Sequence, residues 1–200
     1  MNNGVDRRDV LRRLAAAAVG AATSTAWVDS LTALAQAHSE AHAANTGLAA
    51  QDWTPRVLTA RQNDALVALS ELIIPETDTP GASAARVNRF IDGVLFKATQ
   101  EDRDEFLRGL AWMDERSRSL FGADIVSAAT ADQIALLKKL SDNQNPSFDD
   151  RIGTDFFRAL KSMTISGYYS SEIGLRQELG DDGQLFLAEF RGCDHPEHQG

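Results

Sequence analysis

The stretch that decides the fold spans residues 99–122 and reads TQEDRDEFLRGLAWMDERSRSLFG. A helix is predicted to open at Thr99, with Glu101 and Asp102 in its first turn, where the helix dipole favours negative charge. Gly122 suits the left-handed residue that ends many helices. The apolar residues between these ends recur at helical spacing: Phe106, Leu107, Leu110, Met113, Leu120 and Phe121. The segment therefore predicts an amphipathic helix with one face in a core.

Segments on both sides show the same helical period. A helix is predicted from the N-cap Thr59 up to Pro75, a second over 87–95, another from a capping box at Thr130, and a last one after Pro146. From Gly167 onward, short pieces of chain are punctuated by the glycines at 167, 174, 180, 183 and 192. No β-α-β alternation and no internal repeat is present. We predict an all-α fold, a compact bundle of about five helices with an irregular, glycine-punctuated C-terminal tail.

Composition excludes several classes of function. The chain has 200 residues, 43% of them hydrophobic, which is typical of a globular protein, and its net charge of −9 disfavours binding to nucleic acid. The single cysteine, Cys193, excludes an internal disulfide, a zinc site with several cysteines and a cysteine-ligated iron–sulfur cluster. None of the glycines falls into a dinucleotide or phosphate-binding motif. We therefore expect no cofactor in this chain.

The N-terminus has the pattern of an export signal. Arg7 and Arg8 precede an uncharged stretch, residues 14–28, that would span only about 22 Å as a helix, which is shorter than a membrane core of roughly 30 Å. The consecutive arginines, followed by x-Val-Leu-Arg, resemble the bacterial twin-arginine signal. The small residues Ala35 and Ala37 supply a cleavage site, and Ala33-Leu34-Ala35 is a second candidate.

These boundaries divide the chain into three parts. Residues 1–37 are predicted as a twin-arginine signal peptide, residues 38–58 as a flexible tether, and residues 59–200 as the helical domain. The alternative for the first part is an amphipathic helix that stays on the protein. A single domain of this size can bury a core without a stapling cofactor.

The C-terminal third holds the residues whose chemistry is most specific. Cys193, His195 and His198 could bind a transition metal, but Pro196 prevents a helix from aligning the two histidines, and the alternative is a solvated or partner-contacting tail. Cys193 is either a buried thiol or half of a bridge to another chain. The adjacent aromatics Tyr168 and Tyr169 are typical of core or interface anchors. No arrangement of these residues indicates an active site.

Four segments, in order along the chain, resemble the gluconate 2-dehydrogenase subunit 3 family over residues 59 to 198. They are LIIPETDTPGA at 72–82, FFRALK at 156–161, GYYSSEIG at 167–174 and GCDHP at 192–196. The resemblance implies a small, cofactor-free subunit of a membrane-associated, flavin-dependent sugar dehydrogenase. In that family the large partner holds FAD, and a cytochrome c-type subunit or another electron acceptor often completes the complex. Relatives accompany enzymes that oxidise gluconate, glucose, fructose or C3 of glycosides.

This resemblance and the signal together predict a non-catalytic escort. The twin-arginine translocase exports folded proteins, so a signal on a chain without a cofactor would serve a folded flavoprotein partner. We expect the complex in the periplasm, at the outer face of the inner membrane, with Tyr168, Tyr169, Cys193 and His195 at the partner interface and a disulfide from Cys193. The alternatives are a freestanding periplasmic helical protein, or a metal-binding enzyme using the C-terminal Cys/His tail.

Overall fold

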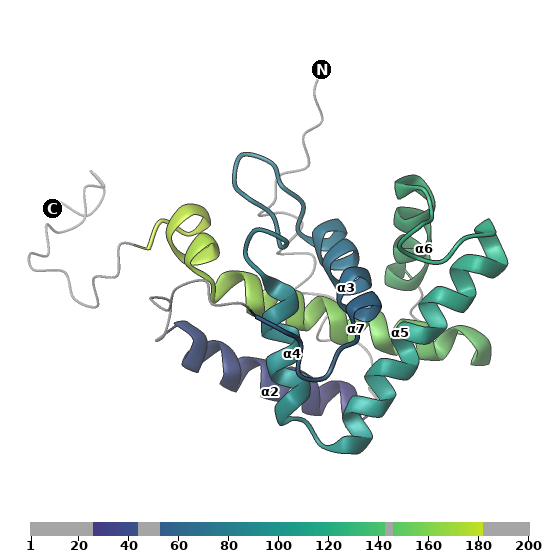
Figure 1. Cartoon of the computed structure of the whole chain (residues 1–200), viewed down its shortest axis with the longest axis horizontal. Helices are drawn as coiled ribbons and strands as arrows, with labels where there is room; N and C mark the ends of the chain where they lie inside the picture. Colours follow the sequence, from purple (N-terminus) through teal and green to yellow (C-terminus); the bar gives the residue numbers. More distant parts are fainter. Residues whose placement is uncertain (1–25, 44–52, 143–145, 182–200) are drawn as a thin grey trace, which may run out of the picture.

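The computed structural model describes residues 26–43, 53–142 and 146–181, and every regular element in these ranges is helical (Figure 1). The elements are α2 (Ala26–Ala43), α3 (Ala60–Ile73), α4 (Val87–Lys97), α5 (Gln100–Phe121), α6 (Thr130–Asp142), α7 (Phe148–Tyr169) and a short π-helix, η1 (Ile173–Glu178). The predicted all-α bundle is confirmed. The described residues add one long helix, α2, to those that the sequence pattern predicted.

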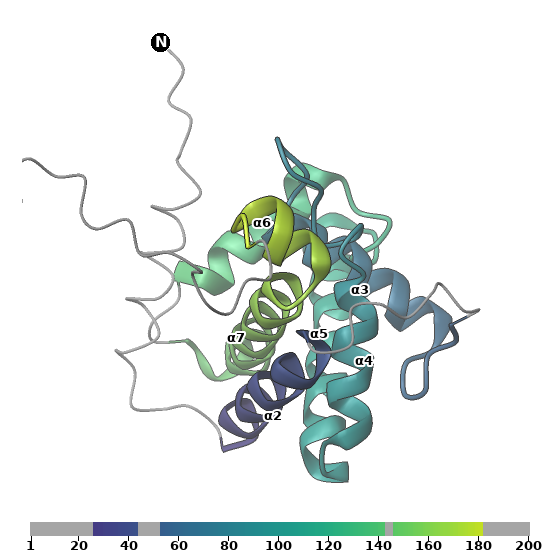
Figure 2. The ribbon, with the colours of Figure 1, turned by 90° about the vertical axis from the view of Figure 1, so that its left-hand side faces the viewer.

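Helix α7 is the centre of the bundle, because helices α2 to α6 all pack against it (Figures 1 and 2). Its buried face carries Phe156, Leu160 and Met163. The rings of Phe156 and Phe106 on α5 are 4.9 Å apart, and Gly109 faces the Phe156 side chain where a Cβ would not fit. The small residue thus lets α5 approach α7 closely.

Helix ends follow the predicted capping chemistry in most places. Thr59 forms a full capping box with Gln62, Thr99 accepts a hydrogen bond from the Asp102 N–H, and Gly122 is left-handed with φ 77°. The capping box predicted at Thr130 is wrong, because Thr130 is already the first residue of α6. Gln133 is buried instead, and its side-chain amide donates to the Ile125 carbonyl at 2.6 Å.

The predicted break at Gly167 is also wrong. Helix α7 continues through Gly167 to Tyr169, and η1 follows it after a short turn. A Cβ at Gly167 would lie 2.9 Å from the Phe90 ring of α4, so this glycine permits a close helix contact and does not end the helix. The glycine-punctuated tail from residue 182 on lies outside the described residues.

The predicted tether at 38–58 differs from the structure at both of its ends. Helix α2 continues to Ala43, across the predicted boundary after Ala37. At the other end, the buried carboxylate of Asp92 on α4 accepts three backbone hydrogen bonds at 2.9–3.1 Å, from the N–H groups of Arg56, Val57 and Leu58. This segment shows no apolar periodicity from which an ordered structure could be predicted. Its backbone N–H groups are held instead by a side chain that is distant in sequence.

Asp92 is therefore expected to be important for stability. Replacing it by alanine leaves three N–H groups without their acceptor, and a buried unsatisfied group costs about 1–3 kcal/mol. From this cost, we predict that Asp92→Ala lowers the free energy of unfolding, measured by urea denaturation, by about 2 kcal/mol. The control is Asp104→Ala, because Asp104 is an exposed aspartate on α5. Equal losses in the two variants would contradict this role.

Candidate partner-binding surface

The segment between α3 and α4 is a loop that a single carboxylate holds together. Glu71, near the end of α3, accepts the Glu76 N–H at 2.9 Å on one oxygen and the Ser83 N–H at 2.8 Å on the other. The Ala82 N–H donates to the Ile74 carbonyl at 2.9 Å and closes the base of the loop. Gly81 lies against the Glu71 carboxylate, where a Cβ would collide with it. The Glu71 carboxylate and Gly81 thus fix the backbone of this loop.

Two side-chain hydrogen bonds tie the loop to the end of α7 and to η1. The Tyr168 hydroxyl, on α7, donates to the Pro80 carbonyl at 2.9 Å. The Thr79 hydroxyl donates to the Glu178 carboxylate, on η1, at 2.6 Å. The loop, the end of α7 and η1 therefore form one unit, although they are some 90 residues apart in sequence.

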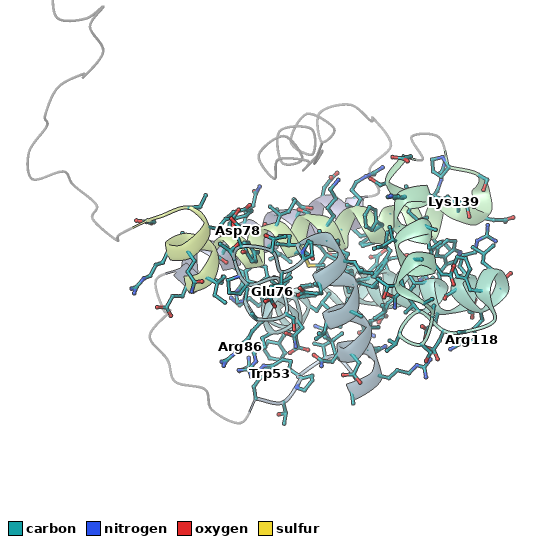
Figure 3. The ribbon with its side chains drawn as sticks, turned by 90° about the horizontal axis from the view of Figure 1, so that it is seen from above. Trp53, Glu76, Asp78, Arg86, Arg118 and Lys139 are labelled. Atoms are coloured by element: carbon teal, nitrogen blue, oxygen red, sulfur yellow. The ribbon has the colours of Figure 1, made fainter. Side chains whose placement is uncertain are left out.

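The outer side of this unit exposes both charge and apolar area. Pro75, Glu76, Thr77 and Asp78 are exposed at the loop tip, and Leu179, directly after η1, has 60% of its surface exposed. We call these five residues the loop surface. Figure 3 shows Glu76 and Asp78 on the η1 side of the molecule, far from Arg118 and Lys139 at the α6 end. The hydrogen bond between Thr79 and Glu178 holds the residue after Glu178, Leu179, at the same end of the molecule as the acidic loop, which makes the loop surface a candidate contact for another protein.

The structure corrects one of the predicted interface residues. Tyr168 is fully buried, so it contacts the loop from inside and reaches no partner surface. Tyr169 is half-buried, and its ring meets that of Tyr168 edge-on, 5.2 Å away. Cys193 and His195 lie outside the described residues, as do Arg7 and Arg8. The predicted cleavage residues Ala35 and Ala37 both lie within α2.

The described residues offer few groups for chemistry at the loop surface. Burial raises the pKa of the Asp155 carboxyl and lowers the pKa of the Lys161 ammonium, but both residues lie on α7. A hydrogen bond from the Ser127 N–H lowers the pKa of Asp124, between α5 and α6. Within residues 26–43, 53–142 and 146–181, no group of three or more metal-binding side chains comes together. None of the helices described there is both long and apolar enough to cross a membrane.

The fold and the site define the class as a small all-α domain with a surface loop fixed between two helices and a π-helix. The family model for gluconate 2-dehydrogenase subunit 3 matches residues 60–181. The chain belongs to this family, whose name implies catalytic partner subunits. The match covers the loop surface and leaves out α2 and the segment with Cys193. Comparison with curated proteins finds no match, and neither does comparison with solved structures.

Three residues of this unit are not predicted from the sequence: Glu71, Glu178 and Leu179. A glutamate at the end of a helix before a turn-rich loop can indicate a carboxylate that accepts hydrogen bonds from the loop, because the backbone N–H groups of such loops need acceptors. Leu179 stands between Glu178 and Gly180 in a polar stretch, and this pattern is consistent with an exposed apolar side chain. No sequence pattern predicts the hydrogen bond between Thr79 and Glu178.

The importance of Glu71 can be tested directly. Glu71→Gln places an amide NH₂ where one of the two backbone N–H groups needs an acceptor, and we expect a loss of about 1 kcal/mol in unfolding free energy. Hydrogen exchange of the amides at 76 and 83 should accelerate more than exchange elsewhere. The matched control is Glu115→Gln, because Glu115 is an exposed glutamate on α5. Unchanged exchange at both amides would show that the loop does not depend on this carboxylate.

Proposed function

We propose that this protein is the non-catalytic small subunit of a periplasmic, FAD-dependent sugar dehydrogenase of the glycoside 3-, glucose-, fructose- or gluconate-oxidising type. In this role it carries the twin-arginine signal for the complex and supports folding, stability and export of the flavoprotein subunit. The flavin belongs to the partner, and a cytochrome c-type subunit or another acceptor takes the electrons. The complex sits at the outer face of the inner membrane.

The observation that carries this proposal is the family match over residues 60–181, combined with the geometry of the segments that suggested the family. The loop at 72–82 and the GYYSSEIG segment at 167–174 are distant in sequence, yet the hydrogen bond from Tyr168 to Pro80 joins them in one unit. The loop surface, which includes the exposed side chain of Leu179, is our candidate contact for the flavoprotein.

The C-terminal segment would add to this contact. Cys193 is the only cysteine of the chain, and an exposed thiol in an oxidising compartment tends to pair. We therefore include a disulfide from Cys193 to the partner, with His195 nearby, in the proposed interface. Non-reducing electrophoresis of the complex, with Cys193→Ser beside it, checks the bridge.

The experiment that tests the function is deletion of this chain in its own host, followed by cell fractionation. We expect sugar-dependent dye reduction to disappear from the periplasm, with any residual flavoprotein found in the cytoplasm. Full-length chain supplied from a plasmid should restore the periplasmic activity. Normal periplasmic activity in the deletion strain would reject the escort role.

A further inference from the structure

Helix α2 is packed into the domain although its sequence resembles the end of an export signal. Val28, Leu31 and Ala35 lie on one face of the helix, and all three are buried. This face packs against α7, α4 and α5, and Figure 2 shows α2 running alongside α7. Leu31 is among the largest side chains that are completely buried in the described residues.

Polar contacts fix the same helix on both sides of the predicted cleavage site. Before the site, the Ser30 hydroxyl donates to the Asp102 carboxylate on α5 at 2.7 Å. After it, the His38 ring lies 5.1 Å from the Phe90 ring, and its Nδ1 lies 2.8 Å from Lys97 Nζ. Gly93 faces the His38 ring, where a Cβ would lie 2.7 Å from Nε2. Residues 26–43 are thus one packed element.

A cut after Ala37 would divide this element. It would remove Val28, Leu31 and Ala35 and leave their apolar partners on α4, α5 and α7 without cover. The cleavage site is also poorly presented, because it is helical and the Ala35 side chain is fully buried. A protease that binds its substrate as an extended strand would first have to detach the helix from the core.

We propose that α2 is a permanent part of the folded domain, and that any processing of the export signal falls before Ala26 and not at Ala35-Gln36-Ala37. The site at Ala35 and Ala37 is then hidden once the domain has folded. The statement about processing rests on the proposed twin-arginine export. The packing of α2 does not depend on it.

Two measurements on the full-length chain, produced in its host and purified, test the proposal. Intact-mass spectrometry should place the N-terminus at or before Ala26. An N-terminus at Gln36 or His38 would overturn the proposal. A chain that never reaches the periplasm would instead count against the proposed function, and the second measurement would still decide the role of α2.

The second measurement compares thermal unfolding of Leu31→Ala and Gln36→Ala. Leu31 is buried and Gln36 is exposed on the same helix, and both precede the predicted cut. We expect Leu31→Ala to lower Tm by roughly 5–15 °C, the usual range for a buried leucine in a chain of this size. Gln36→Ala should change Tm by about 1 °C or less, as surface substitutions do. A Tm for Leu31→Ala equal to that of the unaltered protein would show that α2 is absent from the mature domain.

Discussion

A chain with Arg7→Lys and Arg8→Lys together is expected to leave the flavoprotein partner in the cytoplasm. Lysine keeps the positive charge of the signal, so a loss of export would report recognition of the arginine pair and not general electrostatics. We expect almost all sugar-dependent dye reduction to move from the periplasmic to the cytoplasmic fraction. The partner would be affected as strongly as this chain, because in the proposed function the two travel together.

The matched control for export is Arg13→Lys. It makes the same kind of replacement at the arginine directly after the sequence Arg7-Arg8-x-Val-Leu-Arg. Periplasmic activity should be kept in this variant. If the Arg7/Arg8 variant still delivered dehydrogenase activity to the periplasm, the escort role would be rejected even though the family assignment would stand.

A negative charge at Leu179 is expected to break the complex. In the proposed interface Leu179 is buried by the partner, and a carboxylate placed there would lose its hydration without gaining a counter-ion. It would also stand next to Glu178. We expect Leu179→Glu to weaken binding of the flavoprotein by about 3 kcal/mol, which is roughly 150-fold in Kd. Titration of the purified partner, followed by light scattering or calorimetry, measures this loss.

Ile152→Glu is the control for Leu179→Glu. Ile152 is also an exposed apolar residue, but it lies near the start of α7, about 25 Å of helix rise from Tyr169 at the end that contacts the loop. We expect this variant to bind the partner normally. Equal binding by both variants would move the interface away from the loop surface, and equal weakening would point to a general effect of charge.

The helical bundle could be predicted from the sequence because its information is local. Thr59, Thr99 and Gly122 perform the capping roles that their types suggest, and the apolar period of residues 99–122 gives α5 its buried face. Each of these signals acts within one or two helical turns. They therefore need no knowledge of the rest of the fold.

The errors occur where a residue serves a contact that is distant in sequence. The glycine pattern predicts a break at Gly167, whereas the missing side chain of this glycine lets Phe90 of α4 approach α7 closely. Tyr168 is predicted at the partner interface, whereas it is buried and its hydroxyl donates to the Pro80 carbonyl. In both cases the residue type indicates a structural role, but the residue that it contacts lies about 80 residues away in the sequence.

Helix α2 shows a different limit of sequence reasoning. The spacing of Val28, Leu31 and Ala35 is helical, but an alanine-rich apolar stretch after an arginine pair has the same composition as an export signal. Only the buried faces of α4, α5 and α7 distinguish the two interpretations. The candidate site could likewise be predicted only in part. The sequence of the loop segment points to the site, but the roles of Glu71 and Leu179 depend on contacts that the sequence does not show.

In the proposed function, this chain binds a flavoprotein dehydrogenase and has no redox chemistry of its own. The most direct measurement is affinity purification of the tagged full-length chain from its host, with an absorption spectrum and a dye-reduction assay before and after the subunits are separated. We predict a flavin spectrum and sugar oxidation in the complex, both of which remain with the larger subunit after separation. A chain that elutes without a flavoprotein, or one that reduces the dye by itself when sugar is added, would contradict the account.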